Sequence, residues 1–219
     1  MRWNVGDALG YGWARFRRSP RSYVLGVLVL AVGLAVAASA GVLLQTSLVD
    51  VTSGLGITLL VGALAVGLLV LAALLFGAGF LRGALGVTEG RPFEVRDVLS
   101  TEGVGRIVAT SLVVAAGTFL GSLLCYLPGL AFAFLAQWSL YFVIDRGLDT
   151  RAAIRASVDL VTSRLTESLV WFVVAGLVVA AGAALCGVGL LVALPVVLLG
   201  GAYTYRVLTG QVVEDGAAS

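Results

Sequence analysis

Two cysteines, Cys125 and Cys186, are the residues whose type and position most readily allow covalent chemistry, and the chain has no others. Each begins a short glycine-containing segment near the middle of a long apolar stretch, at 125–129 and at 186–189. A disulfide between them would require their α-carbons to lie within about 7 Å of each other. The alternative is two small residues packed at tight turns. Because no Cys-x-x-Cys pair occurs, we expect no thiol redox catalysis.

A second candidate group is polar but carries no charge. Gln137, Ser139 and Tyr141 lie close together within an otherwise apolar stretch. Burying an amide in an apolar environment is unfavourable unless the amide is hydrogen-bonded. Gln137 is therefore expected either to bond to a neighbouring helix or to line a polar cavity together with Ser139 and Tyr141.

Ionisable residues are almost absent from the apolar stretches. The chain has no histidine, and the only acid or base within these stretches is Asp50, at a polar break. Ion pumps and proton-coupled carriers usually keep an ionisable residue inside the membrane. The sequence also lacks a metal-ligand spacing, a phosphate-binding glycine loop and an acid–base pair. We therefore predict no catalytic residue, no metal site, no cofactor, no nucleic-acid binding and no enzymatic activity.

The elements that must position these residues are predicted to be transmembrane helices. Hydrophobic residues make up 60% of the chain and charged residues only 12%, whereas soluble domains contain about 25% charged residues. Three long stretches are almost free of charge, at 22–81, 107–144 and 168–205. A helix needs roughly 20 apolar residues to cross a bilayer, so each stretch is long enough for two spans.

Polar or Pro/Gly-containing breaks near the middle of each stretch divide it into a hairpin, because proline and glycine interrupt helices. The fold class is thus an all-α integral membrane protein with six transmembrane helices arranged as three hairpins. The six spans are expected at 22–44, 57–81, 107–125, 128–144, 168–186 and 188–206.

The distribution of arginine predicts the orientation. All 14 basic residues are arginines, and none of them lies in the three breaks. Lys and Arg accumulate on the cytoplasmic side of membrane proteins. Both termini are therefore predicted to be cytoplasmic, in a multi-pass protein of the bacterial plasma membrane.

The chain is predicted to form a single transmembrane domain, 1–219, with an internal repeat. An offset of 61 residues aligns Cys125 with Cys186 and Asp145 with Arg206. Each unit combines a short cytoplasmic helix with one hairpin. The three units cover about 4–81, 93–145 and 150–206.

The short helices before the hairpins are expected to be amphipathic, with Asn4 and Thr150 as N-caps. Such helices usually lie flat in the membrane interface. They either cap the cytoplasmic end of the bundle, or form a platform that docks a partner or senses anionic lipid. In the first of them the predicted interfacial residues are Trp13, Phe16, Arg15 and Arg18.

Three segments carry a family resemblance: 6–16, 81–85 together with 90–93, and the Leu-Pro-Gly break at 127–129. They resemble uncharacterised bacterial six-span proteins that are similar to the membrane domain attached to some glycerophosphodiester phosphodiesterases. The resemblance covers most of the chain and implies a membrane fold. It implies no catalytic residue, because the phosphodiesterase barrel is absent from this sequence.

These observations favour a non-catalytic membrane protein that serves as a scaffold, an assembly component or a partner-binding component of the cell envelope. The alternative is a small transporter or lipid-handling protein with a cavity between hairpins. The expected partners are membrane lipids and either another membrane protein or a second copy of the chain.

Overall fold

The computed structural model describes residues 3–48, 55–100, 102–124, 126–185 and 188–213. All regular secondary structure in these ranges is helical. The helices are α1 (Val5–Arg18), α2 (Pro20–Leu48), α3 (Leu55–Thr88), α4 (Val95–Val98), α5 (Val104–Leu124), α6 (Tyr126–Leu135), α7 (Ser139–Arg146), α8 (Thr150–Ser163), α9 (Leu165–Ala184) and α10 (Leu190–Leu208).

Several of these helices are long and apolar enough to cross a bilayer, which confirms the prediction of a multi-pass membrane protein. The apolar segment Leu75–Thr88, at the end of α3, is shorter. Large hydrophobic side chains of α2, α5 and α9 are exposed, among them Val36, Phe119 and Leu177. Hydrocarbon is the environment that makes such exposure favourable. Within the described residues, the five segments of sufficient length are Pro20–Leu43, Val104–Ser122, Leu127–Arg146, Leu165–Ala184 and Leu190–Leu208.

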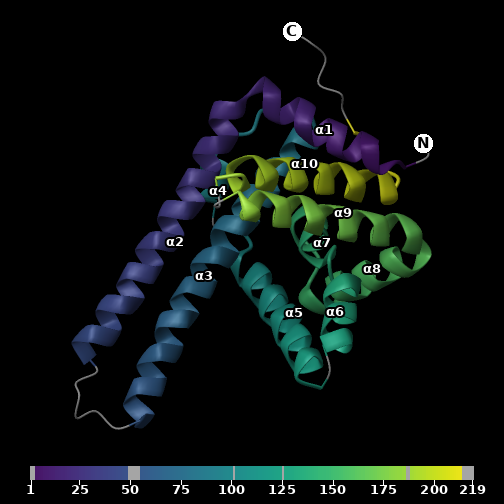
Figure 1. Cartoon of the computed structure of the whole chain (residues 1–219). Helices are drawn as coiled ribbons and strands as arrows, with labels where there is room; N and C mark the ends of the chain where they lie inside the picture. Colours follow the sequence, from purple (N-terminus) through teal and green to yellow (C-terminus); the bar gives the residue numbers. More distant parts are fainter. Residues whose placement is uncertain (1–2, 49–54, 101, 125, 186–187, 214–219) are drawn as a thin grey trace.

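Helix α10 is the central element of the structure. More than half of it is buried (56%), whereas the other four long segments are buried by a third or less. It packs against α1, α2, α3 and α9, and Figure 1 shows α1, α10 and α9 lying across the molecule while α2 and α3 run side by side away from them.

Helix α1 lies antiparallel along α10 and contacts most of its length. The indole of Trp3 donates a hydrogen bond to the Thr204 hydroxyl (3.2 Å), and Gly12 lies against the backbone of Val196 and Gly200. The absence of a side chain at Gly12 is what allows this close approach. The first predicted interfacial helix is therefore attached to the protein core along one side.

The fourth predicted span, 128–144, is not one continuous helix. Turn residues separate α6 from α7 between Leu135 and Ser139. The Ser157 hydroxyl, from α8, donates to the Leu135 carbonyl (2.7 Å) and accepts from the Trp138 amide (3.1 Å). A side chain therefore replaces backbone hydrogen bonds that the interruption removes.

Helix ends and caps agree with the sequence expectations only in part. Helix α3 continues seven residues beyond the expected end of the second span, to Thr88, and α4, in the second unit, is a single turn. Asn4 caps α1 as predicted, by accepting from the Gly6 amide. The predicted cap Thr150 is wrong: Asp149 caps α8, while the Thr150 hydroxyl accepts a hydrogen bond from Thr110.

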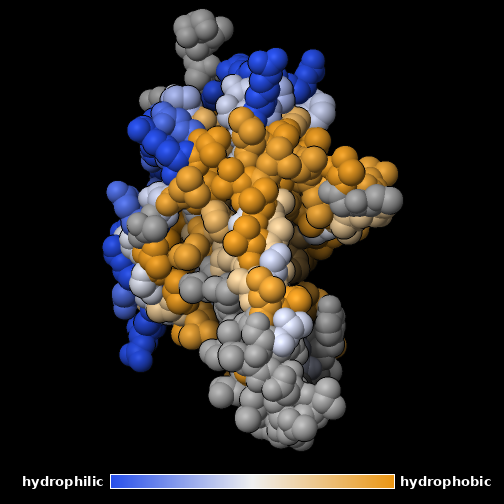
Figure 2. All heavy atoms as spheres, turned by 90° about the vertical axis from the view of Figure 1, so that its left-hand side faces the viewer, coloured by the Kyte–Doolittle hydropathy of each residue, from blue (hydrophilic) through white to orange (hydrophobic). Residues whose placement is uncertain are grey.

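Hydrophilic and hydrophobic side chains are separated on the surface. Figure 2 shows hydrophilic residues along the upper edge and one lateral edge of the molecule, and hydrophobic residues over most of the rest of that face. This is the separation expected when part of a protein's surface faces water and part faces lipid.

Candidate functional site

The most strongly interacting group of charged residues centres on Arg206, near the end of α10. Its guanidinium Nη2 lies 3.0 Å from Oδ1 of Asp145, on α7, and 2.5 Å from Oε1 of Glu89, which follows α3. The side chains of Arg206 and Asp145 are each only 9% exposed, whereas that of Glu89 is 47% exposed. Removing one partner of such a buried pair leaves the other charge uncompensated.

Neutral groups complete this network. The Tyr205 hydroxyl donates to Oδ2 of Asp145 (2.9 Å), and the Gln211 side-chain amide donates to the same oxygen (3.1 Å). Arg206 Nε donates to the Thr88 hydroxyl (3.2 Å), and its Nη1 donates to Oε1 of the Gln211 side chain. The network therefore connects the ends of α3, α7 and α10 with the segment that follows α10.

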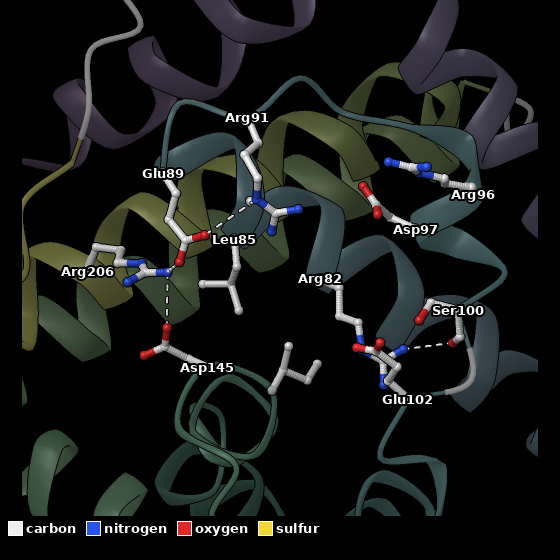
Figure 3. Close-up of a pocket in the computed structure, with 12 residues that line it drawn as sticks. Arg82, Leu85, Glu89, Arg91, Arg96, Asp97, Ser100, Glu102, Asp145 and Arg206 are labelled. Atoms are coloured by element: carbon white, nitrogen blue, oxygen red, sulfur yellow. Dashed lines mark hydrogen bonds and ion pairs between the residues drawn. The ribbon is translucent and has the colours of Figure 1, made fainter.

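An open cavity of about 450 Å³ adjoins this network. Figure 3 shows Arg206, Asp145 and Glu89 at one side of it and Arg82, Ser100 and Glu102 at the other. The charged residues that line it are the arginines Arg82, Arg91, Arg96 and Arg206 and the acids Glu89, Asp97, Glu102 and Asp145.

Arg82 forms one wall of the cavity and connects α3 to the segment before α5. Its Nη1 donates to the Ser100 carbonyl (2.7 Å). Burial lowers the pKa of the Arg82 guanidinium from its ordinary value, and the carboxylates of Glu102 and Asp97 act in the opposite direction. Because the arginine guanidinium is not deprotonated in proteins, we expect this side chain to remain charged at neutral pH.

The chemistry available in the cavity is recognition of charge. Four positive and four negative side chains line it, so it suits a ligand that carries both signs better than a simple anion or cation. Among the described residues there is no group of three or more His, Cys, Asp or Glu side chains that could hold a metal ion.

The predicted polar group lies at the break between α6 and α7. Ser139 and Tyr141 are buried, and Gln137 is partly buried. In the described part of the chain, Gln137 Nε2 and Ser139 Oγ have no hydrogen-bond partner, and the ring of Tyr141 stacks on that of Tyr205 with centroids 5.3 Å apart. The structure thus brings Tyr141 close to the Arg206 network, through Tyr205.

The predicted interfacial residues of α1 divide between its two sides. Phe16 is buried, Trp13 and Arg18 are exposed, and Arg15 is partly exposed. The guanidinium of Arg15 lies over the ring of Tyr11, 5.1 Å from its centroid. Phe16 therefore attaches α1 to the core, and the other three lie on the side of α1 that is at least partly exposed.

The predicted disulfide cysteines, Cys125 and Cys186, both lie outside the described residues. The pairing between them stays a prediction.

The sequence arguments did not identify the Arg206 network. One signal was present, because the 61-residue offset placed Asp145 and Arg206 at corresponding positions. In the structure these two residues form an ion pair. Asp145 and Arg206 would come together in this way if the ends of the second and third repeat units lie side by side in the fold.

Comparison with known proteins shows similarity to mycobacterial sequences. No protein-family model matches the chain, and no solved structure matches it. The chain is 34% identical, over 232 aligned residues, to the uncharacterised protein Rv2560 of Mycobacterium tuberculosis, covering 96% of this chain and 70% of that protein. The uncharacterised protein Mb2590 of Mycobacterium bovis matches with the same identity and coverage. The chain belongs to the same family as these uncharacterised mycobacterial proteins.

Proposed function

We propose that the protein is a non-catalytic scaffold or assembly component of the bacterial plasma membrane that binds a partner protein on its charged side. The arginine distribution supports a cytoplasmic position for that side and for both termini. The resemblance to the membrane domain that accompanies some glycerophosphodiester phosphodiesterases fits this role, because that domain is attached to a separate catalytic one.

The observation that carries the proposal is the mixed-charge cavity of about 450 Å³. Its inner wall contains the buried Arg206–Asp145 pair. At its rim the side chain of Arg96 is 81% exposed and that of Arg91 is 61% exposed. The exposed charges at the rim can pair with opposite charges on a partner protein, and the rigid inner wall fixes the orientation in which the partner binds.

Site-specific photo-crosslinking in intact cells tests the proposal. A photoreactive residue in place of Arg96 is expected to give one discrete protein adduct, and Arg91→Glu in the same background is expected to abolish it, because the reversed charge repels the partner. The same photoreactive residue in place of Leu177, on the exposed apolar side of α9, serves as the control. Adducts to lipid alone at position 96, or an adduct that Arg91→Glu leaves unchanged, would contradict partner binding at the cavity.

A second candidate is a carrier of a lipid or small solute. It is favoured by the three neighbouring polar atoms at the α6–α7 break that have no partner among the described residues: Gln137 Nε2, Trp138 Nε1 and Ser139 Oγ. Interrupted helices form the substrate sites of many transporters. These residues do not line the mixed-charge cavity, which supports the scaffold.

Accessibility to water distinguishes the two candidates. The variant Ser139→Cys, with both native cysteines replaced by alanine, is expected to resist water-soluble maleimides because Ser139 is fully buried. Labelling of this cysteine in membranes, together with protection by a solute or lipid, would favour the carrier instead.

A further inference from the structure

A second cavity, of about 710 Å³, lies between the first turns of α5 and α8. Arg106 on α5 and Arg151 and Arg155 on α8 contribute its positive charges. Val113 and Ile154 contribute an apolar wall. The cavity therefore combines a cationic part with an apolar part.

Both walls of this cavity are fixed by hydrogen bonds. The Thr110 hydroxyl, one turn after Arg106, donates to the Thr150 hydroxyl at the start of α8 (2.9 Å). Arg106 donates to the carbonyl of Gly147, in the segment that leads into α8. The distance between the arginine-bearing turns is thus set by the fold.

The net charge of this cavity is positive, in contrast to that of the mixed-charge cavity. Its one acid, Asp149, directs Oδ1 to the Ala152 amide as the N-cap of α8 (3.3 Å). Among the described residues no carboxylate forms a salt bridge with Arg106, Arg151 or Arg155, whereas Arg91, Arg96, Arg146, Arg164 and Arg206 all have acidic partners. Three arginines thus line one cavity, and no described carboxylate forms a salt bridge with any of them, an arrangement that suits a phosphate.

Because Arg106 lies at the start of α5, the apolar surface of that helix can accommodate acyl chains next to the cavity. Arg106 lies in the first turn of α5, and from there the exposed Leu112 and Val113 continue along the apolar segment Val104–Ser122. A ligand with its phosphate at the arginines would have apolar surface directly beneath it. A phospholipid has both parts, whereas a free phosphate uses only the first.

We propose that this cavity binds the phosphate of an anionic phospholipid, with the acyl chains lying along α5. Arg151 and Arg155 hold the headgroup, and Arg106, fixed to Gly147, completes the cationic wall.

The test uses the full chain in bilayer nanodiscs of equal parts phosphatidylglycerol and phosphatidylcholine. A photoreactive residue in place of Leu112 reports the lipid beside the cavity, and one in place of Phe119, farther along α5 and also exposed, reports the bulk lipid. The identity of each lipid adduct is read from its mass. We expect phosphatidylglycerol to predominate at position 112 and the two lipids to be nearly equal at position 119.

Removing the charges tests the assignment of residues. Arg151→Gln with Arg155→Gln is expected to lower the phosphatidylglycerol preference at position 112 by roughly 10-fold, because each juxtamembrane arginine contributes substantially to binding of anionic lipid. Arg17→Gln with Arg21→Gln removes the same charge from exposed positions and is expected to leave the preference unchanged. Arg151→Lys with Arg155→Lys keeps the charge, is expected to retain most of the preference, and shows that the site tolerates substitution.

Three outcomes would overturn the proposal. The first is equal labelling by both lipids at position 112 in the unmodified protein. The second is an equal loss of preference in the Arg17/Arg21 variant. The third is loss of the preference when inorganic phosphate or glycerol phosphate is added at unchanged ionic strength, because the cavity would then take a soluble phosphate rather than a lipid.

Discussion

At the scale of single residues, the pair formed by Arg206 and Asp145 has the largest expected effect on stability. Both side chains are nearly buried, and their hydrogen-bonding groups are shared among Tyr205, Gln211 and Thr88. Charges taken out of water are expensive unless paired and hydrogen-bonded. The pair therefore stabilises one arrangement of α7 and α10, because any other would leave two buried charges without partners.

The first prediction concerns Asp145→Asn. It removes the buried charge opposite Arg206 and leaves Glu89 as the remaining carboxylate partner, so we expect a destabilisation of roughly 2 to 4 kcal/mol. For a chain of this size that corresponds to a lower melting temperature by about 5 to 10 °C, measured in detergent by tryptophan fluorescence.

The control is Arg96→Gln, which removes a mostly exposed arginine paired with Glu94. Exposed ion pairs contribute little, so its melting temperature should equal that of the unmodified protein. An unchanged melting temperature for Asp145→Asn would show that the network does not stabilise the fold.

The second prediction concerns Ser157→Ala, at the interruption between α6 and α7. The change leaves the buried Trp138 amide and the Leu135 carbonyl without the hydroxyl that bonds to both. We expect a loss of roughly 1 to 3 kcal/mol and a shift in tryptophan emission. Ser163→Ala, on the same helix but exposed, should change neither measurement, and equal effects of the two variants would exclude the bridging role.

Residue-level sequence reasoning succeeded in part where the interaction is local and failed where it is distant. Asn4 was correctly predicted as a cap because the cap bonds to an amide two residues away, whereas the cap of α8 was placed one residue too late, at Thr150 instead of Asp149. The Arg206–Asp145 pair spans 61 residues and forms only because α7 and α10 meet. No local sequence pattern predicts that these two helices are in contact. Tyr141 was selected for a polar cavity, yet its ring stacks on Tyr205 within the core.

At the scale of elements, the attachment of α1 to α10 depends on small residues. Gly12 faces the Val196 carbonyl and lies close to the Gly200 amide. Ala8, on the same side of α1, is fully buried. Close backbone approach through small residues is a common way for helices to pack in membrane proteins.

The third prediction uses this contact. Gly12→Ala places a methyl group against backbone atoms of α10 that cannot move independently, so α1 must shift, with an expected destabilisation of about 1 to 3 kcal/mol. Gly10→Ala is the matched control, because a methyl group there meets nothing within 4 Å and alanine favours helix formation by up to about 1 kcal/mol. Faster proteolysis within α1 for Gly12→Ala and not for Gly10→Ala is the expected result, and similar proteolysis of both would place α1 apart from α10.

Hydropathy predicted which segments are apolar helices and missed how they end. The interruption at 136–138 lies inside a stretch of continuous hydropathy, and it depends on a hydroxyl from α8. The second span was expected to end at residue 81, directly before the charged Arg82. The helix continues to Thr88 because the Arg82 side chain reaches the Ser100 carbonyl while its neighbours Ala84 and Leu85 are buried.

At the scale of the whole molecule, charge and hydropathy define two different surfaces. Helices α1, α4 and α8 carry exposed arginines and supply charged surface, whereas many of the exposed large hydrophobic side chains lie on α2, α5 and α9. Figure 2 shows this separation for one face of the molecule. A bilayer accommodates such a molecule in an orientation that keeps the charged surface in water.

The last prediction follows from that orientation. Arg96 is exposed beside the mixed-charge cavity. In the sequence, Cys125 comes directly after the last residue of α5, whereas Arg106 belongs to the first turn of that helix. If the charged side is cytoplasmic, a membrane-impermeant maleimide applied to intact, reduced cells should label Cys125 and Cys186. Arg96→Cys, with both native cysteines replaced by alanine, should be labelled only after permeabilisation, and the reverse pattern would invert the topology.

The same labelling experiment tests the predicted disulfide. Labelling of the native cysteines without prior reduction would show free thiols and exclude the bond. Labelling only after reduction would support the pairing, and the α-carbons of Cys125 and Cys186 would then have to lie within about 7 Å of each other.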